Sequence, residues 1–580
     1  MRNSLRQTPR TVSHAIALEI QRRGARTYGV VGNGNIYLAS ELQRLESPYT
    51  GMRHEAGAIA AADAHYRATG DIAVATTTYG PGFTNALTPL SEALAARIPL
   101  VYVAGVEPFV DDTLRPRAMD VDSLGILNAL KVRTIIASPT SAEAAIYTAF
   151  EFARDARQPV VVAVPYNLVD AQLEREAIED GVAHELPVTT SLTDTAGADD
   201  ARRAAESIIE QLQNAERPLL LVGRGVVESA TAVETQLLGD RLGALFATTA
   251  MARGAVDSEW SLGICGGFAQ RGRLETFRAA DVVLVLGASM NLLQMRKGTI
   301  FSPEAKILRV DWDPTPNASA LRAPFIEVDR LHRVPLEQLL PAMLQELGDA
   351  ESPEVTRDNK TWRETIGQIP NAEDESLDSG CFAERGEDGK LDPRHVLRRL
   401  DTLLPQERSV VTDGGHFLGW VGKYLSCPDP QATVLVGGAI MTIGLGLSSA
   451  TGVATARPDR FTALISGDGG TQMAMADLGP FLNAASQGAG GALFVMNDAA
   501  YGAEVHQYVP KGLEEQPMLL DEVNFAEIGR AFGVPGLRVS VPEQLADGGE
   551  LAQFLADHRG SACIVDLVIS RVPVADFLKE

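Results

Sequence analysis

The sequence predicts an α/β protein built from three doubly wound domains, each containing a parallel sheet. Three observations support this fold class. The chain has 580 residues, enough for three or four domains at roughly 150 residues each. Short β-branched runs alternate with longer helical patterns, which is typical of parallel sheets covered by helices. Two polar, charged stretches divide this alternation into three sets.

The expected strands follow in chain order. Those of the first set are 28–32, 72–78, 99–106 and 159–165, with Ala-rich amphipathic stretches between them. A charged stretch over 171–200 leads to the second set, which is 218–226, 244–250, 281–288 and 305–313. An acidic stretch over about 347–390 has little apolar periodicity, as expected of an interdomain crossing. The last set is 409–415, 461–470, 491–498 and 562–569. We therefore expect domains at 8–175, 198–345 and 390–575, with a linker at 346–389.

Composition excludes several classes of protein. The formal net charge of −24 repels phosphate backbones, and no Lys/Arg block forms a nucleic-acid patch. The chain begins with no apolar signal-peptide core, and no run reaches the 18 apolar residues of a membrane span. Cys265, Cys381, Cys427 and Cys563 are far apart in sequence and suit reduced thiols. We expect a cytoplasmic protein with a small-molecule substrate and neither a nucleic-acid nor a membrane partner.

A glycine-rich turn gives the sharpest local signal. Gly467-Asp468-Gly469-Gly470 follows an apolar strand and precedes a helical pattern. Such a turn lets backbone N–H groups approach a phosphate, while its acidic residue suits a hard cation. The segment from Asn497 to Gly502 follows the next strand. Ligands of open α/β sheets bind beyond the carboxyl ends of the strands, so the two loops can converge on one metal–diphosphate group.

A second group of motifs lies in the first domain. Glu55, in the segment RHEAGA, begins a helix of small residues, where the helix dipole would offset its charge. The turn YGPGFTN, which includes Pro81 and Asn85, follows the next strand. Helix capping alone would explain a single glutamate, but it does not explain the ordered series of motifs.

Together these motifs resemble thiamine-diphosphate-dependent enzymes of the acetolactate synthase and pyruvate decarboxylase superfamily. The resemblance covers nearly the whole chain and includes GLGLSSATGVATARPDR and NFAEIGRAFGV near its end. It implies pyrimidine-binding, central Rossmann-like and diphosphate-binding domains, in that order. It also implies thiamine diphosphate and Mg²⁺ as cofactors.

The resemblance assigns roles to individual residues. Glu55 would hydrogen-bond the aminopyrimidine of the cofactor, and Asp468, Asp498 and the Ala500 carbonyl would bind Mg²⁺. Ile443 would lie under the bent cofactor, Glu504 would transfer protons, and His416 would border the reacting atoms. Core packing for Ile443, a solvated helix face for Glu504 and a structural role for His416 remain alternatives. The full set assigned to the cofactor is Glu55, Pro81, Asn85, Gly415, His416, Ile443, Gly467, Asp468, Gly469, Gly470, Asp498, Tyr501 and Gly502.

Departures from the family pattern limit which of the family's reactions we expect of this chain. Relatives commonly carry Asn where this chain has Asp498, and Ser where it has Gly470. The His-His pair of pyruvate decarboxylase-like enzymes is missing, which argues against simple decarboxylation. The FQE motif and Asp-Arg pair of acetolactate synthases are also missing. The segment near Ser289, which lines the flavin site in relatives, has changed as well. This argues against FAD but leaves flavin binding open.

We therefore expect a carboligase or lyase that makes or breaks a carbon–carbon bond beside a carbonyl. In reaction class it would be a transferase or a lyase. Its substrates would be 2-oxo acids such as pyruvate, or acyloins, and acetolactate synthase is the closest description. A non-oxidative 2-oxo acid decarboxylase and a catalytically silent regulatory paralogue are the alternatives. Relatives build each site from two subunits, so a homodimer or homotetramer is expected.

Overall fold

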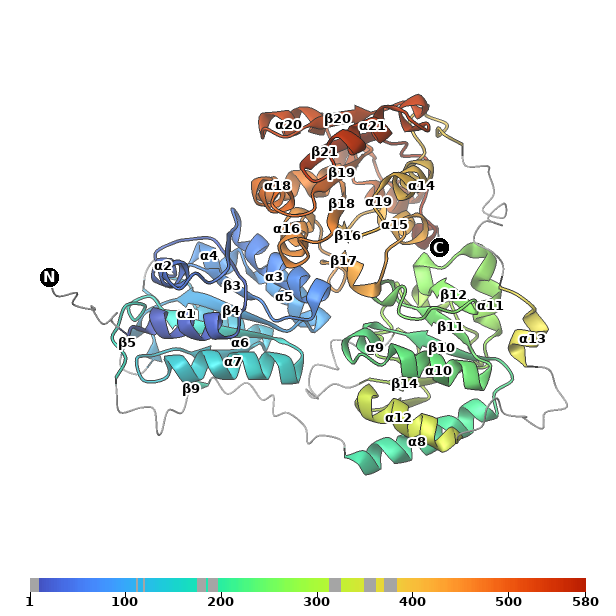
Figure 1. Ribbon diagram of the computed structural model, residues 1–580, viewed down its shortest axis with the longest axis horizontal. Helices are drawn as coiled ribbons and strands as arrows, with labels where there is room; N and C mark the ends of the chain where they lie inside the picture. The colour runs from blue at the N-terminus through green and yellow to red at the C-terminus, as the bar shows by residue number, and fades with distance from the viewer. Residues whose placement is uncertain are drawn as a thin grey trace.

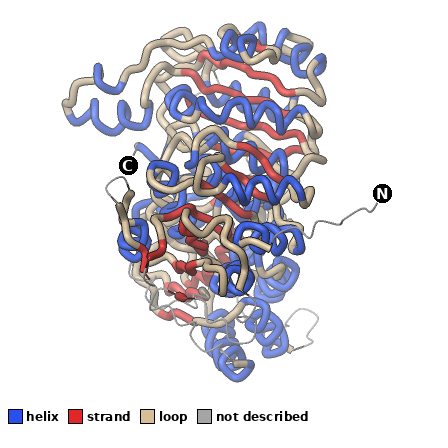
Figure 2. Tube along the Cα trace, turned by 90° about the vertical axis from the view of Figure 1, so that its left-hand side faces the viewer, coloured by secondary structure: helices blue, strands red, loops and turns tan. Residues whose placement is uncertain are grey.

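The computed structural model describes residues 10–110, 113–117, 120–174, 184–185, 197–311, 325–348, 361–369 and 383–579. Three sheets follow one another along the chain, and each belongs to a separate lobe in Figure 1. Figure 2 shows strands lying between layers of helices. The predicted α/β class with three doubly wound sheets is confirmed. The exact domain limits stay a prediction.

The first sheet has the order β2-β1-β3-β4-β8-β7-β9 and is parallel except for β9, which pairs antiparallel with β7. Its strands are β1 (Thr27–Gly29), β2 (Tyr49–Gly51), β3 (Val74–Thr77), β4 (Leu100–Val106), β7 (Arg133–Ile136), β8 (Pro159–Pro165) and β9 (His184–Glu185). A separate hairpin joins β5 (Phe109–Val110) and β6 (Thr113–Leu114). The helices are α1 (Val12–Arg22), α2 (Ile36–Arg44), α3 (Glu55–Thr69), α4 (Pro81–Thr84), α5 (Leu87–Ala96), α6 (Ser123–Leu130) and α7 (Ala142–Ala156).

The second sheet has the parallel order β12-β11-β10-β13-β14-β15. Its strands are β10 (Pro218–Val222), β11 (Leu245–Thr248), β12 (Ser261–Ile264), β13 (Val282–Leu286), β14 (Lys306–Val310) and β15 (Arg330–His332). The helices are α8 (Ala198–Gln213), α9 (Arg224–Glu228), α10 (Ala232–Leu242), α11 (Leu274–Ala279), α12 (Leu336–Leu347) and α13 (Trp362–Ile366).

The third sheet has the parallel order β17-β16-β18-β19-β21-β20. Its strands are β16 (Arg408–Thr412), β17 (Thr433–Leu435), β18 (Phe461–Gly467), β19 (Gly491–Asn497), β20 (Gly536–Val539) and β21 (Ala562–Val568). The helices are α14 (Pro393–Leu403), α15 (Leu418–Tyr424), α16 (Gly446–Ala456), α17 (Asp468–Met473), α18 (Leu478–Ser486), α19 (Gly502–Tyr508), α20 (Phe525–Ala531) and α21 (Glu550–Asp557).

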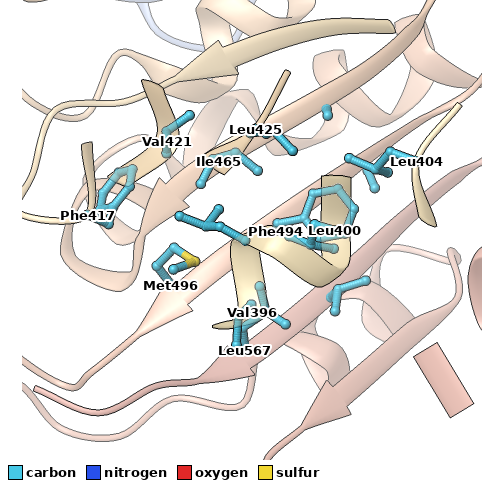
Figure 3. Packing of buried hydrophobic residues seen from close by; sticks show 14 of the residues in the cluster. Val396, Leu400, Leu404, Phe417, Val421, Leu425, Ile465, Phe494, Met496 and Leu567 are labelled. Carbon is cyan, nitrogen blue, oxygen red and sulfur yellow. The ribbon is translucent and has the colours of Figure 1, made fainter. Parts of the chain in front are cut away.

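The central strands form because their residues are apolar on both faces. Every residue of β4, β8, β19 and β21 is buried, as expected of parallel strands covered by helices on two sides. Figure 3 shows one such layer, in which Val396 and Leu400 of α14 lie near Phe494 of β19. Among the strands that were not predicted from the sequence are β2, β12, β15, β17 and β20. They are short edge strands of mixed or exposed burial, so their apolar signal is weak.

Helix α3 belongs to the first domain but packs against the third. Ala60, Ala64 and Ala68 share a hydrophobic core with residues of α16 and the third sheet. A Cβ at Gly452 would lie 2.2 Å from the carbonyl oxygen of Ala61, so only glycine allows the two helices to come this close. Figure 1 shows α3 beside α16. Across the described ranges, no helix is both long and apolar enough to cross a lipid bilayer.

Candidate active site

The third sheet has a crevice at the point where its strand order reverses. The chain runs from β16 to β17 on one side, then returns to β18 and β19 on the other. The loops that follow β16 and β18 therefore part at the carboxyl edge, where doubly wound sheets bind ligands. Gly414 and Gly415 follow β16, and Asp468 follows β18. The fold thus places the glycine-rich turn at the expected binding edge.

A cavity of about 560 Å³ opens at this edge and is lined by residues of all three domains. It brings together every site residue that was predicted in the third domain. These are Gly415, His416, Ile443, Gly467, Asp468, Gly469, Gly470, Asp498, Ala500, Tyr501, Gly502 and Glu504. The predicted residues of the first domain, Glu55, Pro81 and Asn85, are not among the residues that line it.

Asp468 and Asp498 form a buried pair of carboxylates. Their residues are 2% and 7% exposed, and Asp468 Oδ2 has no hydrogen-bond partner among the described residues. Burial, followed by the charge of Asp498, raises the pKa of Asp468 to about 7. Burial also raises the pKa of Asp498 to about 6. The unpartnered Asp468 carboxylate, the Asp498 carboxylate and the Ala500 carbonyl are the kind of oxygen ligands that Mg²⁺ prefers, so the residues present fit this ion.

The magnesium site that we expect has only two side-chain ligands. Within the part of the chain that the structure describes, no three His, Cys, Asp or Glu side chains gather as metal ligands. The predicted set contains only two carboxylates, and its third donor is a backbone carbonyl. Mg²⁺ commonly keeps several waters and completes its shell with substrate phosphates, so two carboxylates are sufficient.

Asp413 explains why position 470 is glycine. Its carboxylate is fully buried and accepts N–H bonds from Gly414 and Gly444, at 2.8 and 3.0 Å. Burial raises the pKa of this carboxyl. A Cβ at Gly470 would lie 2.7 Å from Asp413 Oδ2, which also accepts the N–H of Gly444, at 3.1 Å. The serine that relatives carry at this position would therefore clash. The sequence pattern did not indicate a role for Asp413, because a single Asp before two glycines also suits a simple turn.

Ile443 lies on the loop between β17 and α16. It is only partly buried and lines the cavity, so core packing does not describe its position. Its Cγ2 atom would be 2.8 Å from a Cβ at Gly414, so the isoleucine packs directly over the loop after β16. This position suits the predicted role under a bent cofactor.

His416 lies beside the carboxylate pair as a neutral imidazole. Its Nε2 accepts the backbone N–H of Ala575 at 3.1 Å, which leaves the ring proton on Nδ1. Burial, followed by the nearby His506, lowers the pKa of His416 to about 3. The rings of His416 and His506 are 4.5 Å apart. Glu504 is exposed on α19 and borders the cavity.

The first-domain residues form a second group at the switch point of their own sheet, between β1 and β3. Helix α3 begins at Glu55, as predicted, and His54 caps it by accepting the N–H of Ala56. Glu55 Oε2 accepts a hydrogen bond from Asn85 Nδ2 at 3.0 Å. Pro81 begins α4 nearby. The structure therefore brings Glu55 and Asn85 together, but not with Asp468 inside one cavity.

Asp477 ties the start of α3 to the third domain and was not predicted. One of its oxygens accepts the backbone N–H of Arg53 at 2.7 Å, and the other accepts the Ser448 hydroxyl at 2.8 Å. A Cβ at Gly57 would lie 1.9 Å from Asp477 Oδ2, so the helix start requires glycine there. A lone Asp within an apolar helical pattern gives no sequence signal for such a contact.

Comparisons with known proteins agree with the order of the three domains. Three models of thiamine pyrophosphate enzymes match the chain: the N-terminal TPP binding domain at 10–126, the central domain at 205–323 and the C-terminal TPP binding domain at 413–565. An acetolactate synthase large subunit of Parasynechococcus marenigrum is 27% identical, over 93% of this chain and 85% of that protein. An acetolactate synthase of Arthrospira platensis is 26% identical, over 92% and 91%.

A solved structure supports the fold. It is the thiamine diphosphate-dependent 4-hydroxybenzoylformate decarboxylase of Rhodococcus jostii RHA1, with a TM-score of 0.75 and 18% identity. The alignment covers 97% of this chain and 99% of that one.

Proposed function

The chain belongs to the family of thiamine pyrophosphate enzymes, and we propose that it makes or breaks a carbon–carbon bond beside a carbonyl group. Its substrates would be 2-oxo acids such as pyruvate, or acyloins, as in the acetolactate synthases to which it is similar. Mg²⁺ would accompany the cofactor. The observation that carries the proposal is the cavity that gathers Asp468, Asp498 and Ile443.

Third-domain residues would hold the cofactor. Asp468, Asp498 and the Ala500 carbonyl would bind Mg²⁺, which would in turn neutralise the diphosphate. The glycines from 467 to 470 leave room for the phosphate groups, and Ile443 would support the bent cofactor. When bound, thiamine diphosphate supplies a carbanion that adds to a carbonyl carbon and an electron sink for cleavage of the adjacent bond.

Proton transfer would fall to three side chains. The Glu55 carboxyl would hold a proton against the pyrimidine ring nitrogen. Glu504, at the cavity edge, would exchange protons with the substrate. His416 would donate a hydrogen bond from Nδ1 without carrying charge, because its pKa is far below neutrality. A catalytically silent paralogue is a weaker interpretation, because an unpartnered buried carboxylate is costly to the protein unless it binds a ligand.

Each complete site would require two subunits. Glu55 does not line the cavity of its own chain, and the loop and helix that follow β1 in the same domain expose Val31, Ile36 and Tyr37. The loop around Ile443 likewise exposes Ile440 and Met441. We infer a homodimer or a dimer of dimers, in which Glu55 of the partner subunit faces the cavity. A flavin is not part of this proposal.

Product analysis tests the reaction. The purified protein is incubated with thiamine diphosphate, Mg²⁺ and a panel of 2-oxo acids, with and without added aldehydes and with an EDTA control. Carbon dioxide together with acetolactate or acetoin from pyruvate is the expected result. Carbon dioxide with free acetaldehyde would identify a decarboxylase instead. No metal-dependent turnover of any acid or acyloin would contradict the proposal.

A further inference from the structure

The loop that carries Ile443 has an unusual backbone. It links β17 to α16, and Gly437, Met441 and Gly444 have φ angles of +106°, +62° and +81°. A positive φ is costly for methionine, so surrounding contacts must hold this conformation. Met441 is also 64% exposed. The loop therefore depends on hydrogen bonds to its backbone more than on burial of its side chains.

Two carboxylates supply such bonds. Asp413, from the loop's own domain, accepts the N–H of Gly444. Glu92, from α5 of the first domain, accepts the N–H of Ala439 at 3.0 and 3.1 Å and that of Ile440 at 2.8 Å. Both oxygens of Glu92 therefore bind this loop. The contact joins positions almost 350 residues apart in the chain.

Glu92 is only 1% exposed, and a buried carboxylate is tolerated only when it is paired and hydrogen-bonded. Its nearest cation is Arg67, whose Nη2 lies 3.9 Å away. Arg67 makes a closer ion pair with Asp63 on the same helix. The two loop N–H groups are therefore the closest partners of Glu92. Charge-assisted bonds of this kind are roughly twice as strong as neutral ones.

We propose that Glu92 is a positioning residue of the active centre, which fixes the loop beneath the cofactor through Ala439 and Ile440. This rests on the proposed function, because the loop matters through the cofactor that Ile443 would support. The first domain would then serve two sites. Glu55, at the start of α3, would act in the partner's cavity, while Arg67, in the last turn of α3, contacts the carboxylate that shapes the cavity of its own chain.

Hydrogen–deuterium exchange of the full-length apo protein tests the contact directly. Glu92→Met removes both acceptor oxygens while keeping the volume filled, and Glu92→Gln keeps one acceptor without charge. Asp63→Asn is the matched control, because it removes a buried carboxylate near Arg67 but leaves the loop bonds in place. We expect exchange over 437–444 to rise by about tenfold or more in E92M, several-fold in E92Q, and little in D63N.

Cofactor binding supplies the second readout. We expect E92M to bind thiamine diphosphate with Mg²⁺ about tenfold more weakly than the wild type, with E92Q in between. Unchanged loop exchange in E92M, or equal loss in D63N, would overturn the proposal. If E92M does not fold, E92Q alone tests the proposal, and unchanged exchange over 437–444 in E92Q would overturn the proposal. The exchange measurement needs no cofactor. A wild-type protein that fails to bind thiamine diphosphate would therefore refute the proposed function, while the exchange data would still test whether Glu92 holds the loop.

Discussion

At the scale of single residues, the cavity holds two buried carboxylates, and Asp468 Oδ2 has no hydrogen-bond partner among the described residues. Asp468 and Asp498 are buried side by side, and burial raises the pKa of both. Arg571 lies near Asp498, but its guanidinium donates to the backbone carbonyl of that residue. A divalent cation would satisfy both carboxylates at once. Asp498, where relatives carry Asn, would thus give the ion one more negative ligand.

Gly470→Ser tests the packing around this pair. The new Cβ would meet Oδ2 of Asp413, whose carboxylate accepts the N–H groups of Gly414 and Gly444 and therefore has little freedom to move. We expect the free energy of unfolding to fall by about 1–3 kcal/mol, the usual cost of overpacking. Urea denaturation of the apo protein measures this change. A serine variant as stable as the wild type would show that Asp413 is not held as described.

Sequence alone could predict the local part of the site. The GDGG turn and the segment from Asn497 to Gly502 each follow an apolar strand, and parallel strands deliver such loops to one edge. Asp413, Asp477 and Glu92 could not be predicted, because each accepts a backbone N–H from a segment distant in the chain, at Gly444, Arg53 and Ala439 respectively. Their roles depend on backbone conformations, such as the positive φ of Met441, that residue patterns do not reveal.

At the scale of elements, α3 joins the first domain to the third. Its alanines pack on α16, where Gly452 allows close approach. Beside this contact, the Tyr28 hydroxyl lies 2.9 Å from His65 Nδ1 and 2.6 Å from the Thr455 hydroxyl. The helix is fixed by small-residue packing and by this buried polar group. The sequence predicted the helix and its first residue, but not the partner that it packs against.

His65 makes this contact sensitive to pH. Burial, followed by the charge of Arg26, lowers the pKa of His65 to about 4. Between pH 6.5 and 4 the unfolded chain therefore binds a proton that the folded protein does not, so stability falls as the pH is lowered. The expected loss is about 3 kcal/mol from this residue.

His65→Gln tests that effect. Glutamine can still hydrogen-bond Tyr28 but does not titrate, so unfolding free energies measured from pH 8 to pH 4 should decline less steeply in the variant. The comparison at pH 8, where the histidine is neutral in both states, gives the cost of the substitution itself. Identical pH slopes for variant and wild type would contradict the assignment.

At the scale of the whole molecule, contacts between domains hold the cavity together. Arg97 of the first domain pairs with Asp311 of the central domain at 3.3 Å. Phe577, in the C-terminal 3-10 turn (Asp576–Leu578), lies against Phe268 of the central domain, with ring centroids 5.8 Å apart. Phe577 and Phe268 both line the cavity. The three domains therefore enclose one cavity around Asp468, and Glu55 is not among the residues that line it.

Subunit complementation tests whether Glu55 of one subunit and Asp468 of its partner act in the same site. Glu55→Gln and Asp468→Ala should each abolish turnover, for different reasons. Co-expressed with separate tags, they should form hybrid dimers in which one site has both defects and the other has none.

Purified hybrids should recover about half of the wild-type activity per dimer, because one of two equivalent sites is intact. Size-exclusion chromatography with tandem affinity tags verifies that the hybrids exist. Hybrids that form in full yet remain as inactive as the two parents would show that Glu55 and Asp468 do not meet across subunits, and the proposed active centre would be wrong.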